Sequence, residues 1–203
     1  MTGDRFEILV VCHANLCRSP MAERLARHAI TSRLGEAAAG IEVSSAGTHA
    51  WNNNPMHPLA TDVLREYGAD ETGFRSRRLT EVQVKRADLV LTATRGQRAA
   101  CVAFDPAAVR RTFTIPQIGR YAAALPSYSL MTIWPPQERL RAMIEQVSVV
   151  RGELPVASAN EDELADPMRS PIEVFRRCAA EIQSVIDLIT CLIAPVQTVP
   201  LMP

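Results

Sequence analysis

The segment with the most chemical content runs from Cys12 to Ser19. Five residues separate Cys12 from Arg18, and Ser19 follows directly. A cysteine thiolate can attack phosphorus, a guanidinium can hold two phosphate oxygens at once, and a hydroxyl can donate a hydrogen bond to the thiolate. These residue types at this spacing predict a site that transfers a phosphoryl group through Cys12, with Arg18 and Ser19 supporting it.

The local elements expected around this segment suit that chemistry. The apolar run 6–11 predicts a strand that ends at Cys12, and Pro20 is typical of the first turn of a helix. Between a strand and a helix, backbone N–H groups can converge on an anion, and the helix N-terminus adds partial positive charge. Both effects are expected to lower the pKa of Cys12. The predicted phosphate-binding residues are His13, Ala14, Asn15, Leu16, Cys17, Arg18 and Ser19.

The reaction also benefits from a proton donor, and Asp166 is the predicted one. It lies in the polar stretch 160–168, and Pro167 disfavours helical backbone at Asp166. Asp105-Pro106 is a second Asp-Pro pair, so the dipeptide alone does not decide. The position of Asp166 just before the last amphipathic helix favours it as the acid that protonates the leaving group and then activates water.

The Cys12 segment resembles the loop V-C-x-G-N-x-C-R-S-P of the low-molecular-weight protein tyrosine phosphatases. Ala14 stands where glycine is usual. The resemblance implies a left-handed backbone at Asn15, which asparagine tolerates, and hydrogen bonds from Asn15 that organise the loop. If Ala14 also required positive φ, it would be strained by about 1 kcal/mol or more. The matching positions are Val11, Cys12, Asn15, Cys17, Arg18, Ser19 and Pro20.

Two further segments carry the resemblance. The family places its acid in an Asp-Pro-aromatic motif near the C-terminus; Asp166-Pro167 matches, but Met168 replaces the aromatic that forms one wall of the cleft. Methionine can line a pocket but cannot stack as an aromatic ring does. The run 44–51 matches S-A-G-T-x-x-W of bacterial members. It implies that Ser45 braces Asn15 and that Trp51 forms the opposite wall, although Trp51 could equally be a half-buried anchor.

The leading hypothesis is a cysteine-dependent phosphomonoester hydrolase. Its substrate would be phosphotyrosine in a protein, such as a bacterial tyrosine kinase, or a small aryl phosphate. A small phosphorylated metabolite is an alternative substrate, and a non-catalytic phosphate-binding module is a further alternative. A further alternative is an arsenate reductase, because some arsenate reductases resemble the same family.

These enzymes need two further cysteines, which usually lie close together after the third strand. In this chain Cys101 stands alone after the third expected strand, and Cys178 and Cys191 lie far along the chain, which disfavours this alternative. In the family, Cys12 and Cys17 can form a disulfide that protects the nucleophile.

Composition limits the other classes of function. The 203 residues, 47% of them hydrophobic, suit one domain with one core. Lys plus Arg and Asp plus Glu are 22 each, so no field attracts nucleic acid. No apolar run approaches the roughly 18 residues of a membrane span, and no signal peptide is evident. We therefore expect a cytoplasmic protein, and we expect it to be a monomer without a cofactor. No metal is expected, since the five cysteines and four histidines lack the spacing of metal ligands.

Alternating strands and helices predict an α/β fold, with a parallel four-stranded sheet, helices on both faces and ligand at the carboxyl ends of the strands. We expect one domain over 1–194 with a helical insertion at about 121–159 near the rim of the site or on the surface, and a flexible tail at 195–203. In the first helix, Glu23, Arg24 and Arg27 are expected to be exposed. The expected strands are 6–12, 41–45, 87–92 and 111–115, and the expected helices are 19–34, 58–67, 98–103, 137–150 and 172–193.

Overall fold

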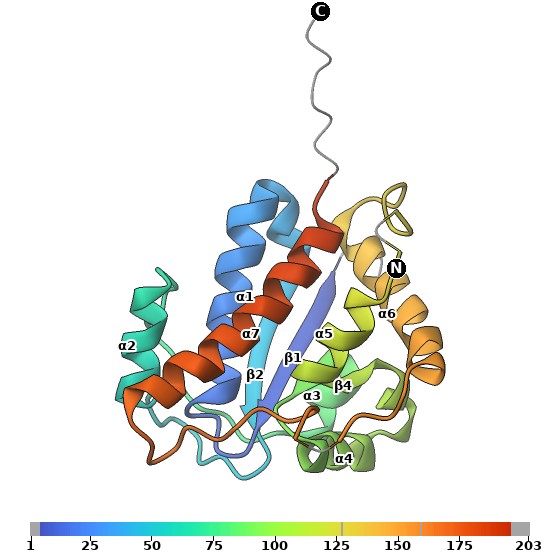
Figure 1. Cartoon of the computed structure of the whole chain (residues 1–203). Helices are drawn as coiled ribbons and strands as arrows, with labels where there is room; N and C mark the ends of the chain where they lie inside the picture. Colours follow the sequence, from blue (N-terminus) through green and yellow to red (C-terminus); the bar gives the residue numbers. More distant parts are fainter. Residues whose placement is uncertain (1–4, 127, 159, 196–203) are drawn as a thin grey trace, which may run out of the picture.

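The computed structural model describes residues 5–126, 128–158 and 160–195. Within them four strands form one parallel sheet in the order β2-β1-β3-β4. Helices cover both of its faces (Figure 1). The α/β fold predicted from the sequence is thereby confirmed. The strands are β1 (Phe6–Cys12), β2 (Ile41–Gly47), β3 (Leu89–Thr92) and β4 (Thr112–Thr114).

The helices follow the alternation that the sequence predicted, with two additions. Gly68, with φ of 68°, follows the end of the second helix, where a left-handed residue is commonly glycine. The α-helices are α1 (Arg18–Leu34), α2 (Pro58–Glu66), α3 (Glu81–Arg86), α4 (Arg95–Phe104), α5 (Ile115–Ala123), α6 (Pro136–Glu153) and α7 (Ile172–Ile193), and the 3-10 helices are η1 (Gly35–Gly40) and η2 (Pro106–Arg111).

The additions are α3 and α5, which the sequence analysis did not predict. Each begins with a threonine whose side chain accepts from the backbone of a glutamine three residues later, while the glutamine side chain caps the threonine. This reciprocal pair satisfies two N–H groups that a short helix would otherwise leave without partners. The signal Thr-x-x-Gln was therefore present in the sequence, at Thr80 and at Thr114.

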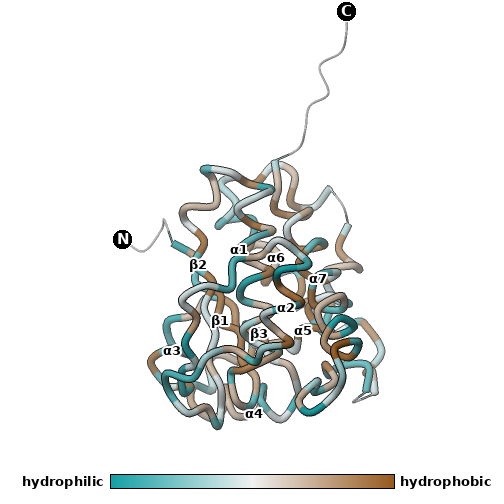
Figure 2. Tube along the Cα trace, turned by 90° about the vertical axis from the view of Figure 1, so that its left-hand side faces the viewer, coloured by the Kyte–Doolittle hydropathy of each residue, from teal (hydrophilic) through white to brown (hydrophobic). Residues whose placement is uncertain are grey.

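The sheet separates two hydrophobic cores because side chains alternate along each strand. On β1, Ile8 and Val10 face the larger core under α1, α5 and α7, whereas Leu9 and Val11 face a smaller core under α3 and α4. In Figure 2 hydrophobic colour runs along β1 and β3 in the interior. Cys12 continues the side of Ile8 and Val10, so the strand register turns its thiol towards α1 and α7.

Helix α6, within the segment expected as an insertion, packs away from Cys12. Its Arg141 pairs with Asp88 at 2.7 Å and donates to the Arg5 carbonyl, and both partners lie beside the amino ends of the strands. The expected place near the rim is therefore wrong for the helix, although the chain after it returns to the carboxyl ends near Ala157. The bounds 121–159 of an insertion and the single domain over 1–194 stay predictions.

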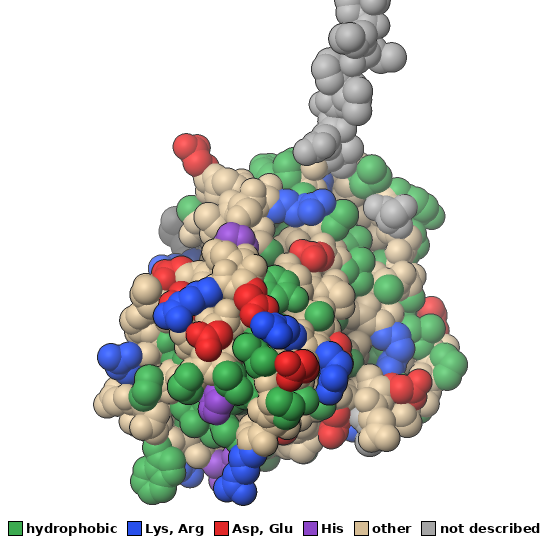
Figure 3. Space-filling view, turned by 60° about the vertical axis from the view of Figure 1, so that its left-hand side comes forward, with side chains coloured by type: hydrophobic (Ala, Val, Ile, Leu, Met, Phe, Trp, Pro, Cys, Tyr) green, Lys and Arg blue, Asp and Glu red, His purple; other side chains and the backbone are tan. Residues whose placement is uncertain are grey.

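The surface carries charges of both signs. On the face drawn in Figure 3, acidic and basic side chains are interspersed. In the structure, ion pairs such as that of Arg176 with Glu66 join neighbouring elements. None of the helices in the described part of the chain is both long enough and apolar enough to span a bilayer. The tail predicted over 195–203 lies, from residue 196 onward, outside the described residues.

Candidate active site

The predicted loop lies where β1 ends and α1 begins. Cys12 is the last residue of β1 and is 3% exposed, and Arg18 is the first residue of α1 and is 5% exposed. The Cys12 Sγ lies 2.9 Å from the Ser19 Oγ. A thiolate in this position is stabilised by a hydroxyl donor and by the partial positive charge of a helix N-terminus.

Asn15 holds the loop from inside. It is fully buried with φ of 56°, and its Nδ2 donates to the hydroxyls of Ser19 and Ser45, each at 2.9 Å. The backbone N–H of Arg77 donates to its Oδ1 at 2.8 Å. Among the described residues with positive φ, Ala14 does not occur, so alanine in place of the usual glycine carries no such strain.

A buried carboxylate sets the direction of these hydrogen bonds. Ser45 donates its proton to the Glu23 Oε2 at 2.6 Å and therefore accepts from Asn15. Asn15 in turn donates to Ser19, whose own proton is left for the Cys12 sulfur or the Ala46 carbonyl. The expectation that Glu23 is exposed is wrong: it is 2% exposed, because the acceptor that Ser45 needs lies inside the fold.

Close packing against β2 fixes the outer side of the loop. A Cβ on Gly47 would lie 2.6 Å from the His13 carbonyl oxygen and 2.8 Å from the Asn15 nitrogen. The backbone N–H groups of Thr48 and His49 donate to the carbonyls of Cys12 and His13 at 3.0 and 2.8 Å. The loop therefore rests on backbone at a position where only glycine leaves enough space.

Asp166 meets the loop through Arg18. The Arg18 Nη2 donates to the Asp166 Oδ2 at 2.6 Å, and its Nη1 donates to the Leu164 carbonyl at 3.3 Å. The Asp166 side chain is half exposed and accepts from the Met168 N–H. Arg18, Asp166 and Met168 border a cavity of about 100 Å³, which is lined by Cys12, His13, Ala14, Leu16, Cys17, Arg18, Asp166 and Met168.

Trp51 is not among the residues that line this cavity. Its side chain is 81% exposed, so it is neither a wall of the cavity in this conformation nor a half-buried anchor. The Trp51 carbonyl accepts from the Ser76 hydroxyl at 2.6 Å, and the neighbouring Asn52 accepts from the Arg78 N–H. These contacts hold the tryptophan loop beside 76–78, and its role stays a prediction.

The sheet separates Cys101 from Cys178, so these two cysteines do not form a pair, and Cys178 lies on the same side of the sheet as Cys12 and Cys17. Cys101 lies in the smaller core and Cys178 in the larger one, on opposite sides of the sheet, and burial raises the pKa of each thiol to about 12. Burial, and then the nearby Cys12, also raises the pKa of Cys17. All five thiols are free in this structure. Among the described residues, no three His, Cys, Asp or Glu side chains are grouped as a metal site requires.

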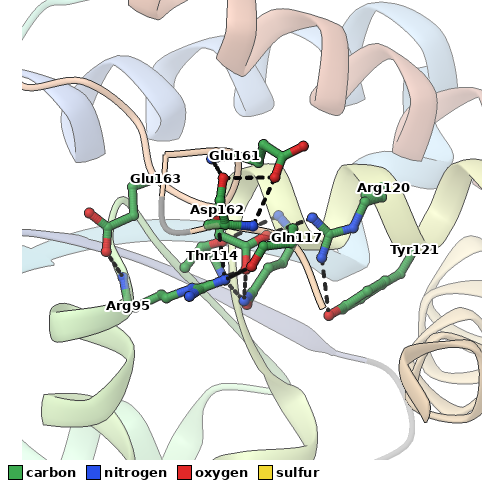
Figure 4. Close-up of polar contacts among 10 residues, drawn as sticks. Arg95, Thr114, Gln117, Arg120, Tyr121, Glu161, Asp162 and Glu163 are labelled. Atoms are coloured by element: carbon green, nitrogen blue, oxygen red, sulfur yellow. Dashed lines mark hydrogen bonds and ion pairs between the residues drawn. The ribbon is translucent and has the colours of Figure 1, made fainter. Parts of the chain in front are cut away.

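One cluster next to the site was missed by the sequence analysis (Figure 4). Asp162, which is 1% exposed, accepts from Arg95 on α4 and from Gln117 and Arg120 on α5. Burial alone would raise the pKa of Asp162, but these hydrogen bonds outweigh burial and lower it. Because Asp162 and its partners on α4 and α5 come from three separate segments of the chain, no local pattern in the sequence marks the cluster.

The sequence model described as "Low molecular weight phosphotyrosine protein phosphatase" matches residues 7–126. A relative from Ralstonia nicotianae, "Probable low molecular weight protein-tyrosine-phosphatase EpsP", is 34% identical over 125 residues, which cover 62% of this chain and 81% of the relative. The "Protein-arginine-phosphatase" of Geobacillus stearothermophilus is 29% identical over 182 residues, which cover 90% and 92%.

Two solved structures are similar over most of the chain. The "YwlE arginine phosphatase from Geobacillus stearothermophilus" aligns with a TM-score of 0.62 and 28% identity, covering 91% of this chain and 90% of that one. The low-molecular-weight protein tyrosine phosphatase from T. tengcongensis aligns with a TM-score of 0.63 and 27% identity, covering 90% and 96%.

Proposed function

Because this chain belongs to the low-molecular-weight phosphotyrosine protein phosphatase family, we propose that Cys12, Arg18 and Asp166 carry out its reaction. The chain is a cysteine-dependent phosphomonoester hydrolase of the protein tyrosine phosphatase type. The observation that best supports the residue assignment is the buried Cys12 sulfur beside the Ser19 hydroxyl, in a cavity that Arg18 and Asp166 also line.

In the first step the Cys12 thiolate attacks the phosphorus of the substrate. The S–P bond forms while the P–O bond to the leaving group breaks, and the leaving oxygen takes the proton of Asp166. The Arg18 guanidinium and the loop N–H groups of residues 13–19 hold the three phosphoryl oxygens. This electrostatic stabilisation is usually the largest catalytic contribution. Such a role requires Arg18 to rotate its donors from Asp166 and Leu164 towards the phosphoryl group.

In the second step water hydrolyses the cysteinyl-phosphate. The Asp166 carboxylate accepts a proton from the water as it attacks, the S–P bond breaks, and inorganic phosphate leaves. Cys12 departs as a thiolate, which the Ser19 hydroxyl stabilises from 2.9 Å. The buried carboxylate of Glu23 supports this step indirectly, since it keeps Ser19 oriented as a donor through Ser45 and Asn15.

The substrate that best fits the cavity is a phosphotyrosine side chain of a protein. Cys12 is buried and the lining includes the apolar side chains of Leu16 and Met168. An aromatic ring can pack against such walls while its phosphate reaches the sulfur, and a short phosphoserine side chain cannot extend as far. Relatives from Ralstonia and Escherichia coli are named as protein tyrosine phosphatases. The monomeric state and the cytoplasmic location stay predictions.

Phosphoarginine in a protein is the second candidate substrate. The observation that favours it is the match with the Geobacillus protein-arginine-phosphatase, which extends over 182 residues and nearly the whole of both chains. Asp166 at the mouth of the cavity could pair with a guanidinium as well as protonate a phenolate. The apolar lining by Leu16 and Met168 favours the aromatic ring, so phosphotyrosine stands first.

The test is a comparison of substrates and variants. The parent protein should hydrolyse phosphotyrosine peptides with a higher kcat/KM than phosphoarginine peptides or sugar phosphates. Its kcat/KM for phosphotyrosine peptides should also exceed that for the reduction of arsenate. Cys12→Ser should abolish turnover of every substrate, and Asp166→Asn should slow substrates with poor leaving groups most. Normal turnover by Cys12→Ser would refute the nucleophile, and a preference for phosphoarginine would replace the proposed substrate while leaving the chemistry intact.

A further inference from the structure

Asp162 is a buried carboxylate that the proposed chemistry does not use. Its Oδ2 accepts from the Arg95 Nε at 3.0 Å, from the Arg95 Nη2, and from the Gln117 Nε2 at 2.8 Å. Its Oδ1 accepts from the Arg120 Nη1 at 2.7 Å. Figure 4 shows these donors converging on the carboxylate from α4 and α5. Asp162 therefore ties the segment before α7 to two helices at once.

The donors are themselves held in fixed orientations. Gln117 lies in the first turn of α5, where its Oε1 accepts from the Thr114 N–H at 3.1 Å and leaves its Nε2 to face Asp162. Arg95 is the first residue of α4, and its Nη2 also donates to the Ala157 carbonyl at 2.6 Å. Both helices present their positive N-terminal ends to the acidic segment, which favours a carboxylate there.

From Asp162 the chain is anchored residue by residue towards the proposed acid. The Glu163 carboxylate accepts from the Arg95 backbone N–H at 2.9 Å. The Leu164 N–H donates to the Ala93 carbonyl at the end of β3, also at 2.9 Å, and the Leu164 carbonyl accepts from Arg18. Asp166, in contrast, is half exposed and accepts from Arg18 and from the Met168 N–H. The buried anchor lies four residues before the acid.

We propose that Asp162 is a positioning residue for Asp166, which joins the acid segment to the N-termini of α4 and α5 so that the Asp166 carboxyl lies over Cys12. The proposal rests on the assignment of Asp166 as the general acid. A proton donor must lie within hydrogen-bond reach of the leaving oxygen, and a displacement of about 1 Å can cost about 100-fold in rate. Asp162 acts through the backbone of 163–165 and not on the substrate.

The substitution Asp162→Asn preserves the shape of the side chain but removes its charge. Arg95 and Arg120, whose side chains are 36% and 30% exposed, would then face an amide that offers one acceptor oxygen in place of two. At least one of the three donor side chains loses its partner, and the segment 162–166 loosens. Proton transfer to the leaving group should suffer, whereas attack by Cys12 should not, because the loop of residues 12–19 has its own supports in Asn15 and Gly47.

The experiment measures kcat/KM for a series of aryl phosphates whose leaving phenols differ in pKa, in four variants of the full chain. This ratio reports the steps up to release of the phenol and not the later hydrolysis of the cysteinyl-phosphate, in which Asp166 also acts. Asp162→Asn should leave hydrolysis of the aryl phosphate with the most acidic phenol almost unaffected. It should slow hydrolysis of the aryl phosphate with the least acidic phenol by about tenfold or more. A general acid contributes about 10²–10⁴-fold in all, so this is a part of its effect. The double variant Asp162→Asn/Asp166→Asn should be no slower than Asp166→Asn, since residues that act as one unit are not additive. Arg120→Gln should show a weaker effect in the same direction.

Asp88→Asn is the matched control. Asp88 accepts from Arg141 at 2.7 Å and from the Glu7 N–H at 2.9 Å, at the far end of the sheet. It should lower stability without changing the dependence on the leaving group. Equal slowing of all aryl phosphates by both Asp162→Asn and Arg120→Gln, or multiplied losses in the double variant, would overturn the positioning role. If Asp166→Asn itself showed no dependence on the leaving group, the acid assignment would fall and this inference with it.

Discussion

Gly47→Ala is the substitution whose consequences follow most directly from the geometry of the loop. The added Cβ would lie 2.6 Å from the His13 carbonyl oxygen, 2.8 Å from the Asn15 nitrogen and 2.9 Å from the Ala14 carbonyl carbon. Because non-bonded atoms pack at about 3.5 Å or more, the backbone of the loop must move by about 0.5–1 Å. All three neighbours are backbone atoms, so no side-chain rotation can relieve the contact.

The displacement acts on the phosphoryl-binding N–H groups. A misplacement of about 1 Å at reacting groups can reduce the rate about 100-fold, and overpacking costs about 1–3 kcal/mol of stability. The assay is kcat/KM for an aryl phosphate, together with the free energy of unfolding from a urea titration. We expect kcat/KM to fall about 100-fold although the variant stays folded at the assay temperature. The loss of activity would then exceed what unfolding of part of the protein could cause.

Two other glycines serve as controls. A Cβ at Gly119 would lie 2.7 Å from the Val185 Cγ2, between α5 and α7, so Gly119→Ala should lower stability with little effect on kcat/KM. A Cβ at Gly152 would meet nothing within 4 Å, so Gly152→Ala should change neither by much. Parent-like kcat/KM in folded Gly47→Ala would refute the argument that close backbone contact shapes the loop.

Three further predictions concern the polar supports. Ser45→Ala leaves the buried Glu23 without its hydroxyl donor and should lower the free energy of unfolding by about 1–3 kcal/mol, measured in urea; an unchanged midpoint would contradict it. Ser19→Ala removes the donor to the Cys12 sulfur and should slow breakdown of the cysteinyl-phosphate, seen as a larger burst of phenol; loss of the burst would speak against it. Because the pKa of Asp162 is lowered in the folded state, the ionised carboxylate stabilises the fold above the ordinary pKa of about 3.9, and this contribution is lost as the pH falls below that value. In urea titrations from pH 6 to about 3, the free energy of unfolding should therefore decrease less for Asp162→Asn than for the parent. Equal decreases would exclude this contribution.

Sequence patterns predicted what depends on local structure. The apolar run before Cys12, Pro20 after the loop and Pro167 after Asp166 each constrain their own neighbourhood, and the structure places Cys12, Arg18 and Asp166 around one cavity. The capping pair of α5 was equally local, and its Thr-x-x-Gln pattern could have been recognised. The alternation of strands and helices along the chain predicted the parallel sheet, and the structure confirms it.

Long-range contacts account for what the sequence analysis missed. Glu23 belongs to a helix whose charged residues looked exposed, but a serine 22 positions later lies within 2.6 Å of it. Asp162 is one of several acidic residues in a polar stretch, and its partners lie 42 to 67 positions earlier. Trp51 lies on a loop whose direction depends on contacts with 76–78, so its exposure could not be deduced from its own neighbours.

Transfer of the phosphoryl group through Cys12 can be tested by direct trapping of the cysteinyl-phosphate. Asp166→Asn should hydrolyse a cysteinyl-phosphate slowly, because the residue that activates water is missing. The variant is mixed with an excess of an aryl phosphate that has a good leaving group, quenched in acid and digested for mass spectrometry. We expect one phosphoryl group on the peptide that contains Cys12, and none with Cys12→Ser/Asp166→Asn. A phosphoryl group on another residue, or turnover without any phosphorylated peptide, would contradict it.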